Sequence, residues 1–444
     1  MERLLMKDLV QWKDSTYRKP LILKGARQTG KTWLLKEFGH LYYNDVAYIN
    51  FEENEEYKQF FETTKDINRI LQNLEMAIGK NIEAENTLII FDEIQECSSA
   101  LNTLKYFYEN APEYHIVAAG SLLGITLSKP NGFPVGKVDF LEMHPMSFSE
   151  FLLANDNLNL VQYMSQINQI EKIPSAFFNP LHELLKLYFI TGGMPEAIYV
   201  WKSAHDVELV QKVLVNILDA YEHDFIKHAE IKDYPKISFI WKSIPSQLSK
   251  ENKKFFYKVV KPGARAREYE NALQWLIDAG LVHKVYRSNA CGLPLSAYDD
   301  LNCFKIYLSD VGLLRRLSNL APSIFNDGNK LFVEFKGALS ENFVLQSLQN
   351  QNDIPLRYWS VDNPSYEVDF ILQKENDIFP IEVKAGSNVK SRSLKKYKEL
   401  YGENIKLRIR YSLENLSLDN DILNIPLFLI DFSDQLINIA LKSL

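Results

Sequence analysis

The chain has 444 residues, too many for one ordinary hydrophobic core, so we expect two to four domains of roughly 100 to 200 residues each. Hydrophobic residues make up 46% of it and charged residues 24%, as in globular chains with well-filled cores. With 50 Lys+Arg against 57 Asp+Glu, its net charge is −7, which excludes a protein covered all over with nucleic-acid contacts but allows a local basic patch.

Other sequence features narrow the cellular setting. Three cysteines, at positions 97, 291 and 303, are too few and too scattered for a disulfide framework or a four-ligand zinc site. No run reaches the roughly 18 apolar residues of a membrane span, and the first residues lack the apolar core of a signal peptide. We therefore expect a cytoplasmic protein that makes no membrane contact.

Residues 25–32, Gly-Ala-Arg-Gln-Thr-Gly-Lys-Thr, have the composition of a phosphate-binding P-loop. An apolar run at 19–24 precedes them, and apolar residues at helical spacing follow at 33–38, which predicts a strand, a loop and a helix. The backbone N–H groups of such a loop face phosphates, so we expect it to bind ATP or a close relative. The residues expected to contact ATP here are Gly25, Ala26, Arg27, Gln28, Thr29, Gly30, Lys31, Thr32 and Trp33.

We expect ATP hydrolysis to take place where this loop lies beside two acidic residues further along the chain, Asp92 and Glu93. Lys31 would reach the β- and γ-phosphates, and the Thr32 hydroxyl would bind Mg²⁺. Apolar residues 88–91 lead directly into Asp92 and Glu93, which predicts a buried parallel strand that ends in carboxylates. Asp92 would hold Mg²⁺ and Glu93 would orient or deprotonate the attacking water. The alternative is a strand capped by solvated acids.

A third strand, 115–119, ends at Gly120 and Ser121. A serine at the end of a strand beside the acidic one suits a catalytic group that senses the γ-phosphate. A turn residue that caps the next helix explains the same serine equally well.

These motifs resemble those of prokaryotic AAA-type ATPases. The resemblance runs from 25–32 through Ile-Ile-Phe-Asp-Glu-Ile-Gln at 89–95 and Ala-Gly-Ser-Leu-Leu-Gly at 119–124 to His-Pro-Met-Ser-Phe-Ser-Glu-Phe at 144–151. It covers nearly the whole chain, which is most similar to members with a C-terminal domain of unknown function that has a restriction-endonuclease-like fold. The resemblance implies an ATPase core in which Walker A, Walker B and sensor positions are held by Lys31, Thr32, Asp92, Glu93 and Ser121.

The pattern of 147–201 is helical except at 191–196, Thr-Gly-Gly-Met-Pro-Glu. In related ATPases a Gly-x-Pro loop at this place belongs to a helical lid and touches the nucleotide. Gly193-Met194-Pro195 resembles that loop, which adds Pro195 to the expected ATP contacts. A plain connection between two helices is the alternative.

Residues 236–286 predict a winged helix. Helical patterns at 236–249 and 266–279 are followed by Gly280 and an alternating strand at 281–286. Basic residues gather on or before the second helix and favour DNA binding. They are Lys254, Lys258, Lys261, Arg265 and Arg267. A solvated face on a module that only joins domains or contacts another subunit explains them as well.

Near the C-terminus, alternating strands at 366–372 and 379–385 joined by a turn at 374–377 predict a hairpin. The alternation allows Asp369 and Glu382, thirteen residues apart (382 − 369), to lie side by side. Convergent acids suit Mg²⁺, and Lys384 would steady charge on a phosphate. The segment resembles PD-(D/E)xK nucleases, with Glu341 as the acid on a helix. Ordinary cross-strand ion pairs are the alternative.

We therefore expect an α/β fold: a P-loop core of AAA type at 1–145, a helical lid at 146–203, a helical linker and winged-helix-like domain at 204–305, and an α/β restriction-endonuclease-like domain at 306–444. The expected function is ATP hydrolysis with Mg²⁺ that drives or switches an action on DNA. A non-nuclease regulator, or a remodeller of protein partners, is the alternative. A homo-oligomer or protein partner stays open, and so does the choice of arginine finger among Arg27, Arg265, Arg267, Arg315 and Arg316.

Overall fold

The computed structural model describes residues 1–127, 136–250, 253–325, 333–351, 355–362, 365–386 and 391–444. They form two compact units. The smaller unit consists of residues 2–144 and 278–281, and the larger unit of residues 1, 145–277 and 282–444. Within these ranges, no helix combines the length and the apolar character needed to cross a membrane.

The smaller unit is built on a parallel sheet of five strands in the order β2-β3-β4-β1-β5. Its strands are β1 (Leu21–Lys24), β2 (Asp45–Asn50), β3 (Thr87–Asp92), β4 (His115–Ala119) and β5 (Asp139–Glu142). Its helices are α1 (Met6–Asp14), α2 (Lys31–Tyr42), α3 (Glu56–Glu62), α4 (Ile67–Ile78), η1 (Ile94–Glu96), α5 (Ser98–Asn110) and α6 (Leu123–Leu127).

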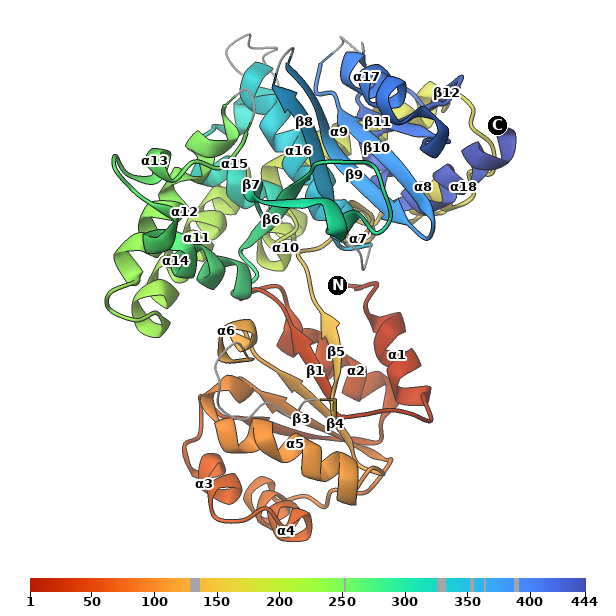
Figure 1. Ribbon diagram of the computed structural model, residues 1–444. Coiled ribbons are helices and arrows are strands. Elements are labelled where there is room, and N and C mark those ends of the chain that lie inside the picture. The colour runs from red at the N-terminus through yellow and green to blue at the C-terminus, as the bar shows by residue number, and fades with distance from the viewer. Residues whose placement is uncertain (128–135, 251–252, 326–332, 352–354, 363–364, 387–390) are drawn as a thin grey trace. The chain divides into compact units, whose positions relative to one another are not determined.

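Helices cover both faces of this sheet (Figure 1). Along β3, Leu88 and Ile90 pack into the core beneath α1 and α2, whereas Ile89 and Phe91 pack into the core beneath α3, α4 and α5. Burial on both faces explains why β3 is apolar throughout rather than alternating with polar residues. Because the strands are parallel, the segments that follow β1, β3 and β4 emerge at one edge.

The first part of the larger unit is helical. Its helices are α7 (Phe148–Ala154), α8 (Leu158–Ser165), α9 (Ser175–Thr191), α10 (Pro195–Ala204), α11 (Val207–His228), α12 (Tyr234–Leu248), α13 (Tyr257–Val260) and α14 (Ala266–Asp278). Helix α7 begins with a capping box, in which Ser147 and Glu150 each bind the other's backbone N–H. The conspicuous 144–151 motif is thus, in part, a helix start.

A mixed sheet of eight strands forms the rest of the larger unit, in the order β12-β13-β11-β10-β9-β8-β6-β7. Its strands are β6 (Val282–Ser288), β7 (Asp299–Leu308), β8 (Arg357–Asp362), β9 (Ser365–Lys374), β10 (Asp377–Val383), β11 (Arg408–Ser412), β12 (Ser417–Asp419) and β13 (Ile422–Pro426). The other helices are η2 (Leu295–Tyr298), α15 (Val311–Leu317), η3 (Pro322–Phe325), α16 (Val333–Gln349), α17 (Arg392–Tyr401), η5 (Gly402–Asn404), η6 (Leu427–Phe432) and α18 (Ser433–Ser443).

The predicted α/β class and the predicted hairpin are confirmed: β9 and β10 pair antiparallel, with Lys374 opposite Asp377. The strand predicted to close a winged helix is β6, which pairs antiparallel with β7 and parallel with β8. It therefore belongs to the same sheet as the hairpin. The finer assignments of a lid, a winged helix and a nuclease-like domain, with their boundaries, stay predictions.

Candidate active site

The loop between β1 and α2 has a backbone that needs glycine at both ends. Gly25 has a φ of 145° and Gly30 a φ of 94°. A Cβ on Gly25 would lie 2.2 Å from the carbonyl oxygen of Met143, so no side chain fits there. Gln28 also has a positive φ, 66°. The two glycines that the motif specifies thus stand where this loop geometry requires them.

The Lys31 side chain folds back over the loop. Its ammonium donates hydrogen bonds to the carbonyl oxygens of Gly25, at 2.9 Å, and Ala26, at 2.8 Å. Burial lowers the pKa of Lys31 to about 8, and the nearby carboxylates of Glu93 and Asp92 oppose that shift. A buried cation held by neutral carbonyls is suited to exchange them for an anionic ligand such as phosphate.

Thr32 and Asp92 lie in direct contact at the carboxyl edge of the sheet. The Thr32 hydroxyl donates to Asp92 Oδ2 at 2.7 Å, and the Tyr48 hydroxyl donates to the same oxygen at 2.8 Å. A hydroxyl and a carboxylate side by side are the hard oxygen ligands that Mg²⁺ takes, so these residues fit the ion. Tyr48 was not predicted, because it comes from β2 and the strand order is needed to place it beside β3.

Glu93 follows β3 with its backbone in the left-handed region, φ 49°, which is strained for a residue other than glycine. Its Oε2 accepts hydrogen bonds from Gln95 Nε2 at 2.5 Å, from the Ser121 hydroxyl at 3.3 Å and from the Ser121 backbone N–H at 3.4 Å. Glu93 N–H in turn donates to Asp92 Oδ1 at 3.1 Å. The structure therefore brings Ser121 to Glu93. Gln95 was missed as a partner, although it belongs to the Asp-Glu-Ile-Gln motif.

The remaining loop residues have more ordinary surroundings. Thr29 is buried, its hydroxyl donates to the Ala26 carbonyl at 2.9 Å, and its own carbonyl accepts from Arg3 at 2.8 Å. Arg27 is half-buried, and Trp33 is 44% exposed on the first turn of α2. An exposed aromatic ring beside the loop is available to a base or sugar.

Pro195, the predicted lid contact, begins α10 in the larger unit. The loop before it is fixed inside that unit, where the Gly193 N–H donates to Asp310 Oδ2 at 2.6 Å. A Cβ on Gly192, which has a φ of 70°, would lie 2.2 Å from Asp310 Oδ1. The loop is thus held by the C-terminal part of the unit, and its contact with a nucleotide stays a prediction.

Arg315, one of the candidate arginine fingers, has a structural role in this fold. It is fully buried and donates to the carbonyl oxygens of Leu320 at 2.5 Å and Ile190 at 3.1 Å, and to Gln211 Oε1 at 2.7 Å. Burial lowers its pKa to about 10. A guanidinium committed to three acceptors is not free to reach a phosphate.

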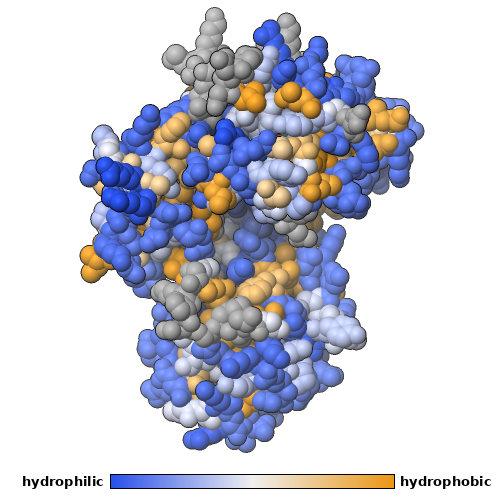
Figure 2. Space-filling view, viewed as in Figure 1, coloured by the Kyte–Doolittle hydropathy of each residue, from blue (hydrophilic) through white to orange (hydrophobic). Residues whose placement is uncertain are grey.

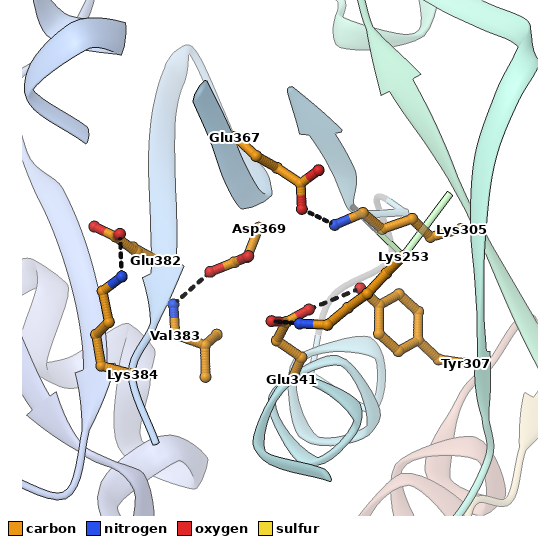
Figure 3. Close-up of polar contacts among 9 residues, drawn as sticks. All are labelled: Lys253, Lys305, Tyr307, Glu341, Glu367, Asp369, Glu382, Val383 and Lys384. Carbon is orange, nitrogen blue, oxygen red and sulfur yellow. Dashed lines mark hydrogen bonds and ion pairs between the residues drawn. The ribbon is translucent and has the colours of Figure 1, made fainter. Parts of the chain in front are cut away.

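The acids of the predicted nuclease site lie in the larger unit, on α16, β9 and β10 (Figure 3). Glu341 forms an ion pair with Lys253, and its Oε2 accepts from the Tyr307 hydroxyl at 3.3 Å. Asp369 Oδ2 accepts from the Val383 N–H at 2.8 Å. Burial and the Glu341 charge raise the pKa of Asp369 to about 8.

Glu382 and Lys384 form an ion pair of 2.6 Å, and Glu367 pairs with Lys305. In Figure 3 the Glu382 carboxylate turns toward Lys384 and away from Asp369. Among the residues placed by the structure, no group of three or more His, Cys, Asp or Glu side chains is arranged to hold a metal ion. As they lie, these carboxylates bind lysines and a backbone N–H, Glu382 Oε2 is buried without a hydrogen-bond partner, and the nuclease-like metal site stays a prediction.

Comparison with known families divides the chain into three consecutive segments. Residues 17–152 match an AAA domain, residues 182–323 a domain of unknown function (DUF8612), and residues 336–429 another domain of unknown function (DUF4143). The chain thus carries a P-loop ATPase domain of AAA type, which implies ATP binding, followed by two domains of unknown function. No curated protein matches the chain.

Solved structures give more distant likenesses. The Walker-type ATPase PABY2304 of Pyrococcus abyssi is 14% identical, with 71% of this chain and 95% of that chain covered and a TM-score of 0.46. The ORC1 protein of Aeropyrum pernix in complex with DNA is 13% identical over 72% of this chain and 92% of its own, with a TM-score of 0.27. Cdc6p of Pyrobaculum aerophilum is 14% identical over 71% of this chain and 93% of its own, with a TM-score of 0.24. At these TM-scores the likenesses carry no argument about function.

Proposed function

We propose that this protein hydrolyses ATP with the help of Mg²⁺ and uses the hydrolysis to switch an action on DNA by its larger unit. The observation that carries the ATPase part is the contact between Thr32 and Asp92, 2.7 Å, beside a P-loop and next to Glu93. The hydroxyl and the carboxylate are the pair that would hold Mg²⁺, and the ion would neutralise charge on the phosphates.

Lys31 has the binding role in this proposal. Its ammonium leaves the carbonyls of Gly25 and Ala26 when an anion enters the loop, and then pairs with the β- and γ-phosphates. The loss of two neutral acceptors is offset by charge-assisted bonds, which are about twice as strong as neutral ones.

Glu93 is the proposed general base. A carboxylate oxygen of Glu93 takes a proton from the attacking water, and Ser121 and Gln95 hold the carboxylate in place through its Oε2. Ser121 adds a hydroxyl within reach of the same oxygen, which supports its predicted role as a sensor of the nucleotide.

The DNA part of the proposal is supported by a basic cluster between α12 and α14. Three lysine ammonium groups surround the Phe256 ring, at 4.7 Å for Lys250, 5.8 Å for Lys254 and 5.4 Å for Lys258. Burial and the neighbouring Lys258 lower the pKa of Lys250. Positive charges placed close together repel one another and are stabilised by a bound anion. The phosphate backbone of DNA supplies several negative charges in a row.

The second candidate function is that of a regulator whose larger unit binds DNA or protein but cuts nothing. The lysine partners of Glu341, Glu367 and Glu382 favour it, because those acids are already neutralised.

Binding of a fluorescent ATP analogue tests the nucleotide site. Lys31→Ala should weaken binding at least tenfold, because it removes a charge-assisted hydrogen bond to phosphate that contributes roughly 1.5–3 kcal/mol. Lys80→Ala is the matched control: Lys80 is an exposed lysine paired with Asp45, and its removal should leave binding unchanged. Equal binding by wild type and Lys31→Ala would contradict the assignment.

A further inference from the structure

We propose that the three glutamates of the acidic cluster of the larger unit (Glu341, Glu367, Asp369 and Glu382) are neutralised by the protein's own lysines and that Asp369 is held by a backbone N–H, so that this domain acts on its partner without a bound metal ion. The inference goes beyond the proposed ATPase function and does not depend on it. It assigns Lys253 and Lys305 the charge-compensating role that a divalent cation would have beside these acids.

Lys305 is the clearest of these countercations. It lies on β7 with its side chain 0% exposed, and it pairs with Glu367 on β9. A fully buried ammonium is stable only beside a compensating charge. Its stem also lies near the Tyr358 ring, with Nζ 4.8 Å from the ring centre. The charge of Glu367 is therefore committed to an internal lysine.

Glu341, the helix acid of the predicted metal site, has both oxygens engaged. Its Oε1 pairs with Lys253 and its Oε2 accepts the Tyr307 hydroxyl at 3.3 Å. The side chains of Glu341 and Lys253 are only 5% and 14% exposed. Figure 3 shows Lys253 reaching to Glu341 from the same side as Lys305 reaches to Glu367. Magnesium binds carboxylate oxygens directly or through its waters, whereas both oxygens of Glu341 already accept hydrogen bonds from the protein.

The two acids of the hairpin face different partners. Asp369 accepts the Val383 N–H, whereas Glu382 pairs with Lys384. Glu382 also lies opposite Arg410 in the register of β10 and β11. One carboxylate is thus tied to the backbone of the next strand, and the other is turned toward a lysine and an arginine.

The three glutamates of the cluster each form an ion pair with a different lysine. Asp369, the remaining acid, has a backbone donor. Lys384 binds one oxygen of Glu382, Oε1, whereas Glu382 Oε2 is buried and has no hydrogen-bond partner among the described residues. The expected consequence is a rigid ion-pair network that shapes the domain for binding, with no metal-activated water at this place.

Manganese binding tests the inference directly. Mn²⁺ is titrated into the full, nucleotide-free chain and the bound ions are counted by electron paramagnetic resonance. Wild type and the isosteric variant Asp369→Asn should bind the same number of ions. One ion fewer in Asp369→Asn would overturn the proposal, and so would Mg²⁺-dependent DNA cutting that this variant loses.

A stability measurement supplies a second, independent readout. Lys305→Met should lower the Tm by several degrees because it leaves Glu367 buried and unpaired, and adding Glu367→Gln to it should restore most of the loss. If Lys305→Met instead leaves the Tm unchanged, Lys305 is not a countercation and the proposal fails.

Discussion

At the residue scale, the nucleotide site depends on backbone conformations that only part of the motif reveals. Gly25 approaches Met143 too closely for any side chain, and its glycine identity was readable from the motif. Glu93 holds a φ of 49°, a conformation that costs on the order of 1 kcal/mol outside glycine, and nothing local in the sequence indicates it.

The two missed contacts differ in origin. Tyr48 contacts Asp92 only because β2 flanks β3, whereas Gln95 contacts Glu93 from two residues further along the same segment. Periodicity predicts which face of a strand a residue occupies, but the order of strands decides what it meets. Lys253 and Lys305 show this at the acidic cluster, where their partners lie 88 and 62 residues along the chain.

His115 provides a pH-dependent prediction for the smaller unit. It is buried at the start of β4 and contacts the Tyr43 hydroxyl through Nδ1 at 2.7 Å, and burial lowers its pKa to about 4. The unfolded chain, with a histidine pKa near 6.5, binds more protons than the native protein between these values. The free energy of unfolding should therefore fall as the pH drops from 6.5 toward 4, by about 3 kcal/mol from this residue.

Denaturant unfolding at pH 7 and pH 4 measures this loss. The loss in wild type should exceed that in His115→Gln, because the variant has no imidazole to protonate. His40→Gln, at an exposed position on α2, is the control and should behave as wild type. The same pH dependence in His115→Gln as in wild type would show that His115 is not the titrating group.

At the element scale, local sequence patterns predict neighbouring elements such as a hairpin, but they do not predict which distant strands pair. The hairpin of β9 and β10 follows from alternation and a short turn. The capping box of α7 was not predicted, although Ser147 and Glu150 stand three residues apart in the sequence. The place of β6 does not follow, because its parallel partner β8 begins 71 residues beyond Tyr286 (357 − 286). Neither strand's own sequence indicates which distant strand it pairs with.

The basic cluster between α12 and α14 allows a prediction of how two lysine substitutions change the affinity for DNA. Figure 2 shows strongly hydrophilic surface on the side of the larger unit where Figure 1 places α13 and α14. Lys250→Gln/Lys258→Gln should weaken binding to a labelled DNA duplex and reduce the slope of log K against log salt by about 1.8, or about 0.9 for each phosphate that a lysine no longer neutralises. Fluorescence anisotropy at several salt concentrations measures both the affinity and the slope.

Lys232→Gln/Lys242→Gln is the matched control, since these lysines are exposed and already paired with Glu230 and Glu222. It has the same change in net charge and should keep the wild-type slope. Equal slopes in all three proteins would place the DNA contact elsewhere. No DNA binding by wild type would instead remove DNA from the proposed function and leave the ATPase assignment standing.

At the scale of the whole molecule, buried hydrogen bonds tie the predicted lid to helices α15 and α16. Asp310 accepts from Gly193, Arg315 donates to the Ile190 carbonyl, and Gln346 donates to the Tyr188 hydroxyl at 3.1 Å. The loop before α10 is thus held in place by the start of α15 and by α16.

The central claim is that Glu93 is the base of an ATPase. The measurement is steady-state ATP turnover together with ATP binding for wild type, Glu93→Gln and, as a control, Glu96→Gln. Glu93→Gln should bind ATP as wild type does but turn it over at least about 100-fold more slowly, the range expected for loss of a general base, whereas Glu96→Gln should match wild type. Turnover by Glu93→Gln within about twofold of wild type would contradict the account.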